Sequence, residues 1–264
     1  MAVAYITVCG AALAASALTL FSGFGLGSVM MPVFALFFPL EMAVAATAVA
    51  HLLNNIFKMG LVGKHADMKV VAAFAVPGAA AAFAGALTLN LIAGLSPVAE
   101  YELWGQTRSI SPIALVISGM MIVFSMFELL PSLQKIEFEK KWLPLGGAMS
   151  GFVGGVSGHQ GALRSTFLAK AGLSKQVFIG TGVVAAVVVD ISRLLVYGFT
   201  FFSRDFLAIS EYGGTGLIAA ATLSAFAGSF AGSRLMKKVT LETVKYIVGG
   251  MLLILAVALG SGIV

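Results

Sequence analysis

The stretch Gly158-His159-Gln160-Gly161-Ala162-Leu163-Arg164-Ser165-Thr166 interrupts a run of small and apolar residues that otherwise extends from Gly151 to Ala171. An arginine in the middle of a bilayer costs about 2.5–3.5 kcal/mol on insertion scales, so we expect it to face a cavity, a partner or an ion. The glycines predict a break in the helix, with a new half-helix beginning near Ala162. The unpaired N–H groups and the positive dipole end of that half-helix would lie beside Arg164 and would favour an anion.

The first half of the chain contains a comparable interruption. It is Ser22-Gly23-Phe24-Gly25-Leu26-Gly27-Ser28, followed by Met31-Pro32. Two apolar segments interrupted by Gly or Pro in corresponding halves of a chain indicate the binding site of a transporter. We therefore expect both interruptions to contribute to one site.

Composition places the chain in a membrane. Of its 264 residues 59% are hydrophobic and 10% are charged, and the mean hydropathy is +1.03. The apolar runs are long enough for helices that cross a bilayer, and they lack the alternation of barrel strands. The 16 Lys and Arg exceed the 11 Asp and Glu, but the cations lie in short loops, so we expect no nucleic-acid partner. The first segment, Met1 to Phe21, lacks a basic region before its apolar stretch, which favours a retained helix over a cleaved signal peptide.

Ten apolar segments are visible, and two of them are too short to span a bilayer. Val29–Phe38 and Leu163–Ala171 each follow a glycine break, so each is expected to form a hairpin with the segment before it. The ten segments are Val3–Phe21, Val29–Phe38, Met42–Phe57, Val70–Leu91, Pro112–Leu130, Leu143–Val156, Leu163–Ala171, Val177–Phe201, Gly214–Gly232 and Val244–Val264. The predicted fold is an all-α integral membrane protein with about ten helical segments.

The two halves have the same order of elements, which predicts a duplication. Each half contains a broken-helix hairpin followed by three full spans, and we place the two repeats at residues 1–134 and 135–264. A shift of 134 residues superimposes Ser16 on Ser150, Gly27 on Gly161 and Thr47 on Thr181, although the identity is thin.

The loop charges indicate that the repeats are inverted. With five segments per half, twelve cations fall on one side: Lys58, Lys64, Lys69, Lys135, Lys140, Lys141, Lys170, Lys175, Arg234, Lys237, Lys238 and Lys245. The other side keeps Arg108 beside Glu100 and Glu102, and Arg204 beside Asp205 and Glu211. The positive-inside rule then puts the twelve in the cytoplasm and both termini outside. Equivalent loops of the two halves carry opposite charge bias, which predicts that the second repeat is inverted. Inversion would bring the two glycine breaks together near the midplane. Chance bias in a ten-helix protein is the alternative.

Polar residues recur at helical spacing on the span Met42–Phe57. Thr47, His51, Asn54, Asn55 and Lys58 lie on one predicted stripe. One interpretation is that the amides and the imidazole form hydrogen bonds between helices while Lys58 extends to the cytoplasmic surface. The other interpretation is that His51, Asn54 and Asn55 line a hydrated path.

Asp190 and Arg193 lie three residues apart on the equivalent span, and Tyr197 is four residues further along on the same face. A structural ion pair would neutralise two otherwise costly charges. Alternatively, Asp190 carries a proton, and its protonation releases Arg193 to bind an anion.

Arg164 is the strongest candidate for binding an anion, with Ser165, Thr166, Gln160 and Ser28 as hydrogen-bonding groups and Gly27 and Gly161 at the starts of the half-helices. If the half-helix lies shallow, Arg164 would instead extend to the lipid headgroups. His159 could couple protons or remain a neutral, hydrogen-bonded histidine. Glu41 and Glu128 lie at span ends and are expected to be solvated.

The sequence gives little support for catalysis. No His, Cys or acidic cluster has the spacing of metal ligands, so we expect no metal and no cofactor. Cys9 is the only cysteine, which excludes an intrachain disulfide. A membrane enzyme would need a nucleophile with a base or a metal, and only His159 with Ser157 and Ser165 approaches that. A structural membrane subunit is a further alternative.

The two glycine motifs resemble those of the TauE/SafE sulfite exporter family. The first copy is Gly23-Phe24-Gly25-Leu26-Gly27-Ser28-Val29-Met30-Met31-Pro32, and the second extends from Gly154 to Thr166. The segment from Gly172 to Gly182 is also similar to the sequence after the second motif in that family. His159 and Gln160 depart from the all-glycine form, and the second copy lacks the proline.

The resemblance implies secondary transport, as an exporter, of a small sulfur-containing anion such as sulfite or an organosulfonate across the cytoplasmic membrane. Protons are a candidate coupling partner, and the oligomeric state is left open. An anion-selective channel would use similar parts, and saturable exchange versus ohmic flux distinguishes the two.

Overall fold

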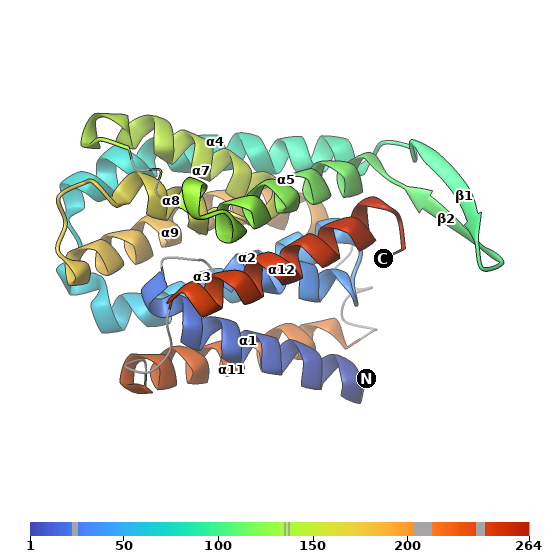
Figure 1. Cartoon of the computed structure of the whole chain (residues 1–264), viewed down its shortest axis with the longest axis horizontal. Coiled ribbons are helices and arrows are strands. Elements are labelled where there is room, and N and C mark those ends of the chain that lie inside the picture. The colour runs from blue at the N-terminus through green and yellow to red at the C-terminus, as the bar shows by residue number, and fades with distance from the viewer. Residues whose placement is uncertain (23–25, 135, 137, 203–212, 236–240, 264) are drawn as a thin grey trace.

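The structure is a bundle of helices with one small β-hairpin outside it (Figure 1). This computed structural model describes residues 1–22, 26–134, 136, 138–202, 213–235 and 241–263. Within those residues ten helices have eight or more residues, and five helices are long and apolar enough to cross a membrane. The ten are α1 (Ala2–Ser22), α2 (Leu26–Ala35), α3 (Leu40–Val62), α4 (Met68–Ala93), α5 (Pro112–Leu129), α7 (Leu143–Ser157), α8 (Gly161–Leu168), α9 (Lys175–Tyr197), α11 (Gly214–Leu235) and α12 (Leu241–Gly260). The predicted all-α membrane fold is confirmed.

Short elements connect the long helices. Helix α3 continues into the 3₁₀ turn η1 (Gly63–His65), and α9 continues into a π-helical turn, η3 (Gly198–Phe202). The connection from α5 to α7 contains α6 (Pro131–Gln134) and the 3₁₀ turn η2 (Lys140–Trp142). Four of the cations and acids assigned above to loops, Lys135, Arg204, Asp205 and Glu211, lie outside the described residues, as do Lys237 and Lys238.

Both predicted helix breaks are present. Helix α1 ends at Ser22 and α2 begins at Leu26, while α7 ends at Ser157 and α8 begins at Gly161. Residues Gly23, Phe24 and Gly25 of the first motif lie outside the described residues. Helix α8 returns to the region from which α7 starts, because Lys170 forms a β-bridge with Glu139 and Phe167 stacks on Phe138 at 4.2 Å. The α7–α8 pair is therefore a hairpin whose closed tip lies inside the bundle.

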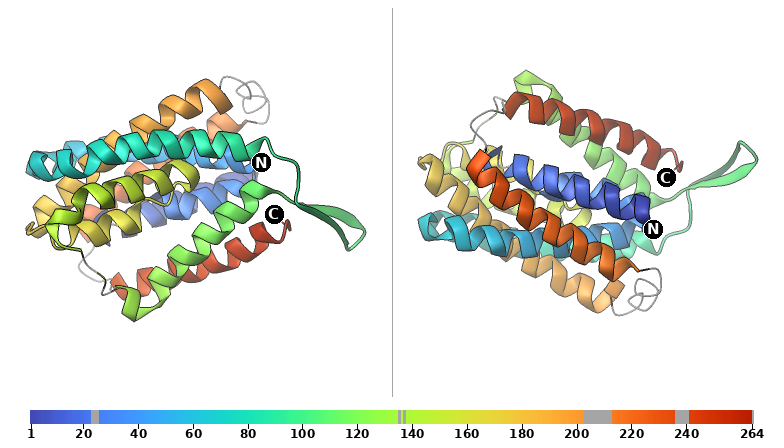
Figure 2. Two further views of the ribbon diagram at one scale, coloured as in Figure 1. Left: turned by 90° about the horizontal axis from the view of Figure 1, so that it is seen from above. Right: turned by 90° about the horizontal axis from the view of Figure 1, so that it is seen from below.

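Helices that match between the two halves pack in matched pairs. Helix α1 lies along α11, just as its counterpart α7 lies along α4. The counterparts α3 and α9 pack against each other, and so do α5 and α12. Helix α1 starts at the end of the bundle that holds both termini, whereas α7 starts at the opposite end (Figures 1 and 2). This exchange of partners is the pattern of contacts that two inverted repeats would make; the boundary at residues 134 and 135 stays a prediction.

Glycines allow α7 to approach α4 closely. A Cβ placed on Gly151 would lie 2.0 Å from the carbonyl oxygen of Gly78, and one on Gly147 would lie 2.0 Å from that of Phe74. Small residues let helices in a membrane approach until their backbones touch, which maximises van der Waals contact. The α4–α7 contact thus fixes the position of the hairpin that carries Arg164.

We expect Gly151→Ala to destabilise the protein by about 1–3 kcal/mol, because the added methyl group would overlap the α4 backbone and force the helices apart. Gly119→Ala is the matched control, since a Cβ at this helical glycine meets no atom within 4 Å. It should be neutral or stabilising by up to about 1 kcal/mol. Thermal unfolding of both variants in detergent measures the difference, and equal melting temperatures would contradict the close contact.

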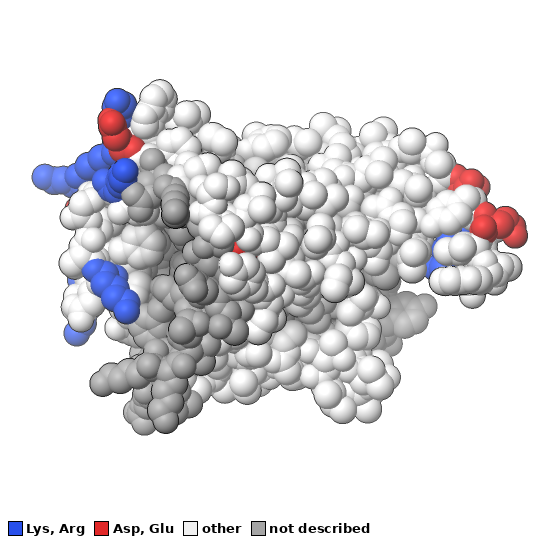
Figure 3. Space-filling model, viewed as in Figure 1, with Lys and Arg blue, Asp and Glu red and all other residues white. Residues whose placement is uncertain are grey.

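Charged side chains gather at the two ends of the bundle (Figure 3). Lys and Arg predominate at the end that holds η1 and η2, where six exposed lysines lie: Lys64, Lys69, Lys140, Lys141, Lys170 and Lys175. The β-hairpin at the other end carries Glu100, Glu102 and Arg108. The expectation that Lys58 extends to the cytoplasmic surface is wrong, because the residue is only 4% exposed.

Glu128 was expected to be solvated, and this is wrong: the residue is 2% exposed. A Cβ placed on Gly249 of α12 would lie 2.8 Å from Glu128 Cβ, so the end of α5 is covered by α12. Glu41, the other acid at a span end, is partly exposed.

The β-hairpin was not predicted. Strands β1 (Ala99–Leu103) and β2 (Gln106–Ile110) pair in antiparallel fashion between the apolar segments Val70–Leu91 and Pro112–Leu130. Trp104 and Gly105 connect them with φ of 53° and 72°, as the tight turns of hairpins require. The hairpin also contacts the C-terminal segment, since Arg108 donates to Ile263 O at 3.0 Å and the Tyr101 hydroxyl donates to Ser261 O.

Candidate functional site

The two hairpins meet at the centre of the bundle. Gly27, in the first turn of α2, lies against the backbone of Gly158, so that a Cβ on Gly27 would be 2.7 Å from Gly158 O. Gly158 has φ of +81°, a conformation that side chains rarely adopt, and this allows α7 to end there. Thr47 of α3 lies beside both glycines. The two helix breaks are therefore adjacent in the structure, although these glycines are 131 residues apart in the sequence.

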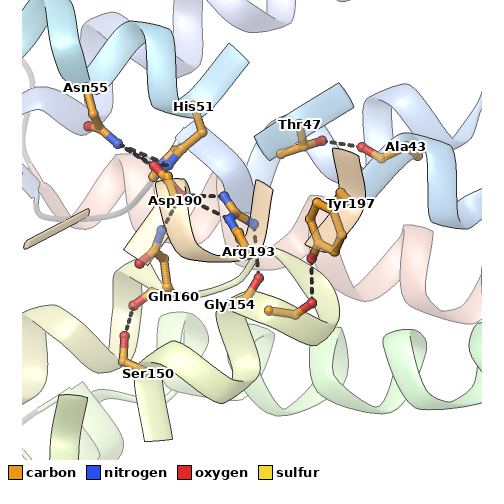
Figure 4. Close-up of polar contacts among 11 residues, drawn as sticks. Ala43, Thr47, His51, Asn55, Ser150, Gly154, Gln160, Asp190, Arg193 and Tyr197 are labelled. Carbon is orange, nitrogen blue, oxygen red and sulfur yellow. Dashed lines mark hydrogen bonds and ion pairs between the residues drawn. The ribbon is translucent and has the colours of Figure 1, made fainter. Parts of the chain in front are cut away.

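Asp190 on α9 is the centre of a buried polar network beside this contact (Figure 4). Arg193 donates to Asp190 Oδ1 from Nε at 3.0 Å and from Nη2 at 2.7 Å, and Gln160 Nε2 donates to the same oxygen at 2.8 Å. On the other side of the carboxylate, His51 Nδ1 lies 2.6 Å from Oδ2, and Asn55 Nδ2 donates to Oδ2 at 3.3 Å. The carboxylate thus joins α3, α9 and the tip of the second hairpin, and all five side chains are at most 5% exposed.

The last turn of α7 supplies carbonyl acceptors to the same network. Arg193 Nη1 donates to Gly154 O at 3.0 Å, and the Tyr197 hydroxyl donates to Gly155 O. Gly154 O also accepts from the N–H of Gly158 at 3.0 Å, so it is shared between the helix cap and the guanidinium. Carbonyl groups in the last turn of a helix lack the usual partners within the helix, which leaves Gly155 O available to the phenol. The expected Asp190–Arg193 ion pair is confirmed, and Tyr197 lies on the same face but bonds to α7 instead of to the pair.

The polar stripe on α3 divides into two directions. His51 and Asn55 face Asp190, whereas Asn54 faces α1 and α11. The amide nitrogen of Asn54 donates to Ser229 Oγ at 2.9 Å and to Ala225 O at 3.2 Å, and its amide oxygen accepts from Lys58 Nζ at 3.2 Å. Ser16 of α1 lies 2.6 Å from Ser229, oxygen to oxygen. Asn54 thus forms the hydrogen bonds between helices that one interpretation of the stripe expects, whereas the serines of this cluster were not predicted. Ser16 aligns with Ser150, whose hydroxyl donates to Gln160 O at 2.9 Å.

Arg164 is buried, with 7% of its surface exposed. Its Nε lies 3.6 Å from where a Cβ on Gly182 of α9 would be. A side chain that extended to lipid headgroups would be exposed on the surface of the bundle. Arg164 instead lies inside it, on the half-helix that begins at Gly161.

The hydroxyl groups predicted to accompany Arg164 bond within α8. Ser165 donates to Gly161 O at 2.9 Å and Thr166 donates to Ala162 O at 3.0 Å. Both oxygens keep acceptor capacity, but each would have to rotate to donate to an anion. Gln160, predicted to bind substrate, uses its amide on Asp190. Ser28, like Gly27, is buried in the first turn of α2.

His159 lies between the two helices of the second hairpin. Its Nδ1 is 2.9 Å from Ser157 O, and its ring stacks on Phe124 of α5 with centroids 5.7 Å apart. Its Nε2 has no hydrogen-bond partner among the residues that the structure describes. The imidazole is therefore held by one nitrogen while the other is available.

Among the residues that the structure describes, more cationic than anionic side chains are buried. The described part of the chain buries three cations, Lys58, Arg164 and Arg193, and two carboxylates, Glu128 and Asp190. Three or more His, Cys, Asp or Glu side chains that could together hold a metal are not found in the described ranges. Buried guanidinium groups and the N-terminal N–H groups of two half-helices are features suited to holding a small anion.

A protein-family model matches nearly the whole chain. The model described as Sulfite exporter TauE/SafE matches residues 8–259 of 264. No curated protein and no solved structure matches the chain. The predicted resemblance is confirmed, and the family is one of membrane transporters of sulfite and related sulfur anions. A membrane-embedded chain with two broken hairpins and a family match of this extent belongs to the sulfite exporter TauE/SafE family.

Proposed function

We propose that this protein is a secondary transporter that exports a small sulfur-containing anion, such as sulfite or an organosulfonate, across the cytoplasmic membrane. The observation that carries the proposal is the meeting of the two hairpin tips at Gly27 and Gly158, beside the buried Arg193. Arg164 would attract the anion, and the N–H groups at the starts of α2 and α8 would orient it. The family supplies the class of substrate.

Transport would proceed by alternating access around this fixed site. The α4–α7 and α1–α11 pairs each join helices from different repeats, so rocking one set of helices against the other would open the centre to each side in turn. The basic end of the bundle would be cytoplasmic and both termini would lie outside, by the positive-inside rule. The chain would thus sit in the cytoplasmic membrane as a multi-pass protein.

Coupling to protons is a hypothesis that the Asp190 network motivates. Protonation of Asp190 would weaken its bonds to Arg193 and His51 and free the guanidinium for an anion. His159, with its unoccupied Nε2, is the second candidate carrier. The double variant Asp190→Asn/Arg193→Met tests the first route, because transport that keeps its full dependence on a pH gradient would exclude Asp190 as the carrier.

Flux measurements on purified protein in liposomes test the proposed function. We expect saturable uptake of sulfite that exceeds that of chloride and that accelerates when the opposite compartment contains sulfite. Sulfoacetate and thiosulfate in parallel define the substrate class. A current that rises linearly with voltage without saturation would indicate an anion channel, and absence of any flux above empty liposomes would reject transport of these anions.

A further inference from the structure

We infer that His159 determines which form of the anion is bound, by accepting a hydrogen bond from an O–H group of the ligand. The inference rests on the proposed function and deepens it, because it names the ligand as an oxyanion that keeps one proton, such as hydrogensulfite. Cations and helix N-termini offer only donors, so they attract any small anion. An acceptor beside those donors favours an anion that carries a proton of its own.

The hydrogen bonds of His159 fix which ring nitrogen carries the proton. Nδ1 lies 2.9 Å from Ser157 O and 3.2 Å from Ser157 Oγ. The carbonyl oxygen can only accept, and the hydroxyl of Ser157 already donates to Val153 O at 3.1 Å. Both oxygens beside Nδ1 are therefore acceptors, so Nδ1 carries the proton. In a neutral imidazole the other nitrogen, Nε2, then presents a lone pair.

The surroundings of His159 favour the neutral imidazole. The residue is 1% exposed, and none of the ion pairs among the described residues includes it. The guanidinium of Arg193 is close to its backbone, because Nη1 lies 3.4 Å from where a Cβ on Gly158 would be. A buried imidazolium without a carboxylate and near a guanidinium would be costly, so the lone pair on Nε2 is kept.

The Nε2 atom is available to a ligand. It is buried, and within the described ranges it has no hydrogen-bond partner. The ring cannot easily turn away, because it stacks on Phe124 of α5 with an interplanar angle of 3° and is held at Nδ1 by Ser157. A buried acceptor without a partner is costly, so a ligand that supplies a donor to Nε2 gains free energy by pairing with it.

His159 lies beside the free N–H groups of the second half-helix. It is two residues before Gly161, where α8 begins, and Arg164 is the first residue whose N–H bonds back, to Gln160 O at 3.1 Å. The N–H groups of the first three residues therefore have no partner within the helix. Gln160 makes no side-chain cap, because its amide points to α9 instead (Figure 4). Donors for the anion and one acceptor thus occupy adjacent positions at the hairpin tip.

Two anions of equal charge test the inference. At a mildly acidic pH sulfite is largely hydrogensulfite, which carries one proton, whereas methanesulfonate is a monoanion without an O–H group. We expect sulfite to raise the melting temperature of the wild type in detergent more than methanesulfonate does. In His159→Phe, which keeps a ring to stack on Phe124, the apparent affinity for sulfite should fall about tenfold or more. The affinity for methanesulfonate should stay the same or rise.

Two further variants show whether the effect comes from the acceptor. A glutamine can place its amide oxygen near the position of Nε2, so His159→Gln should keep part of the preference for sulfite. His65→Phe is the matched control, because His65 is an exposed histidine in η1. It should bind both anions as the wild type does. Uptake of sulfite into liposomes, with methanesulfonate as the competitor, measures the same preference during transport.

The outcomes separate this inference from the proposed function. Equal losses of affinity for both anions in His159→Phe, or failure of His159→Phe and His159→Gln to fold, would make His159 a support for the hairpin tip and overturn the inference. A wild type without preference for sulfite over methanesulfonate would overturn it as well. Loss of the response to a pH gradient with unchanged sulfite affinity would make His159 a proton carrier, which equally contradicts it. A wild type that neither binds nor moves sulfite would instead remove the proposed function.

Discussion

Asp190→Asn should destabilise the protein by about 3–5 kcal/mol, the usual cost of removing one partner of a buried ion pair. The carboxylate accepts hydrogen bonds from Arg193, Gln160 and Asn55 and lies 2.6 Å from His51 Nδ1. An amide of the same shape offers one oxygen to these donors and turns its NH₂ group toward others. Arg193, which is fully buried, would be left without a counter-charge. Thermal or denaturant unfolding in detergent measures the loss.

The double variant Asp190→Asn/Arg193→Met should recover much of that stability. Removing the guanidinium together with the carboxylate eliminates the uncompensated charge, so the two changes should be strongly non-additive. Asp67→Asn is the matched control, because Asp67 caps α4 by accepting from the N–H groups of Lys69 and Val70, a role that Asn fills equally well. If the losses of stability in Asp190→Asn and in Arg193→Met simply add in the double variant, Asp190 and Arg193 are not coupled.

The local features of this site could be predicted from the sequence, because they depend on helical spacing. Asp190 and Arg193 are three residues apart, and any helix brings such residues together. Glycines beside Arg164 interrupt the apolar run, and a half-helix begins at Gly161, one residue before the expected position. The placement of hydrophobic segments likewise required only their length and composition.

The contacts between helices could not be predicted in this way. His51 and Asp190 are 139 residues apart, and their pairing depends on how α3 packs against α9. Asn54 and Asn55 are neighbours, so a rotation of about 100° between them sends one toward α11 and the other toward α9. Glu128 is buried because α12 covers the end of α5, which the sequence near Glu128 does not indicate.

The β-hairpin was missed for a different reason. Alternation over five residues is a weak signal beside long apolar helices, and the turn is formed by Trp104 and Gly105 instead of the common Asn-Gly. Its contact with residues near the C-terminus is again a tertiary contact that the local pattern does not reveal.

Arg164→Met should reduce the rate of sulfite transport at low concentration by about 10–100-fold, because a charge-assisted hydrogen bond contributes about 1.5–3 kcal/mol. The effect should be larger than that of any other single change at the centre. Arg193 is neutralised by Asp190, and the hydroxyls of Ser165 and Thr166 bond within α8. Arg164→Lys should give an intermediate rate, since it keeps the charge but loses the planar pair of donors.

The experiment must separate a lost binding group from a displaced helix. Lys170→Met is the matched control, because Lys170 is two residues beyond the end of α8 and is exposed. Liposome uptake of sulfite over a range of concentrations gives the apparent affinity and maximal rate of each variant, and melting temperatures show whether α8 is still packed. A structural role would lower the melting temperature and the maximal rate together. A binding role lowers the affinity for sulfite while the protein stays folded, because the guanidinium then acts on the ligand and not on the packing of α8; an Arg164→Met protein with wild-type uptake at every concentration would place the anion elsewhere.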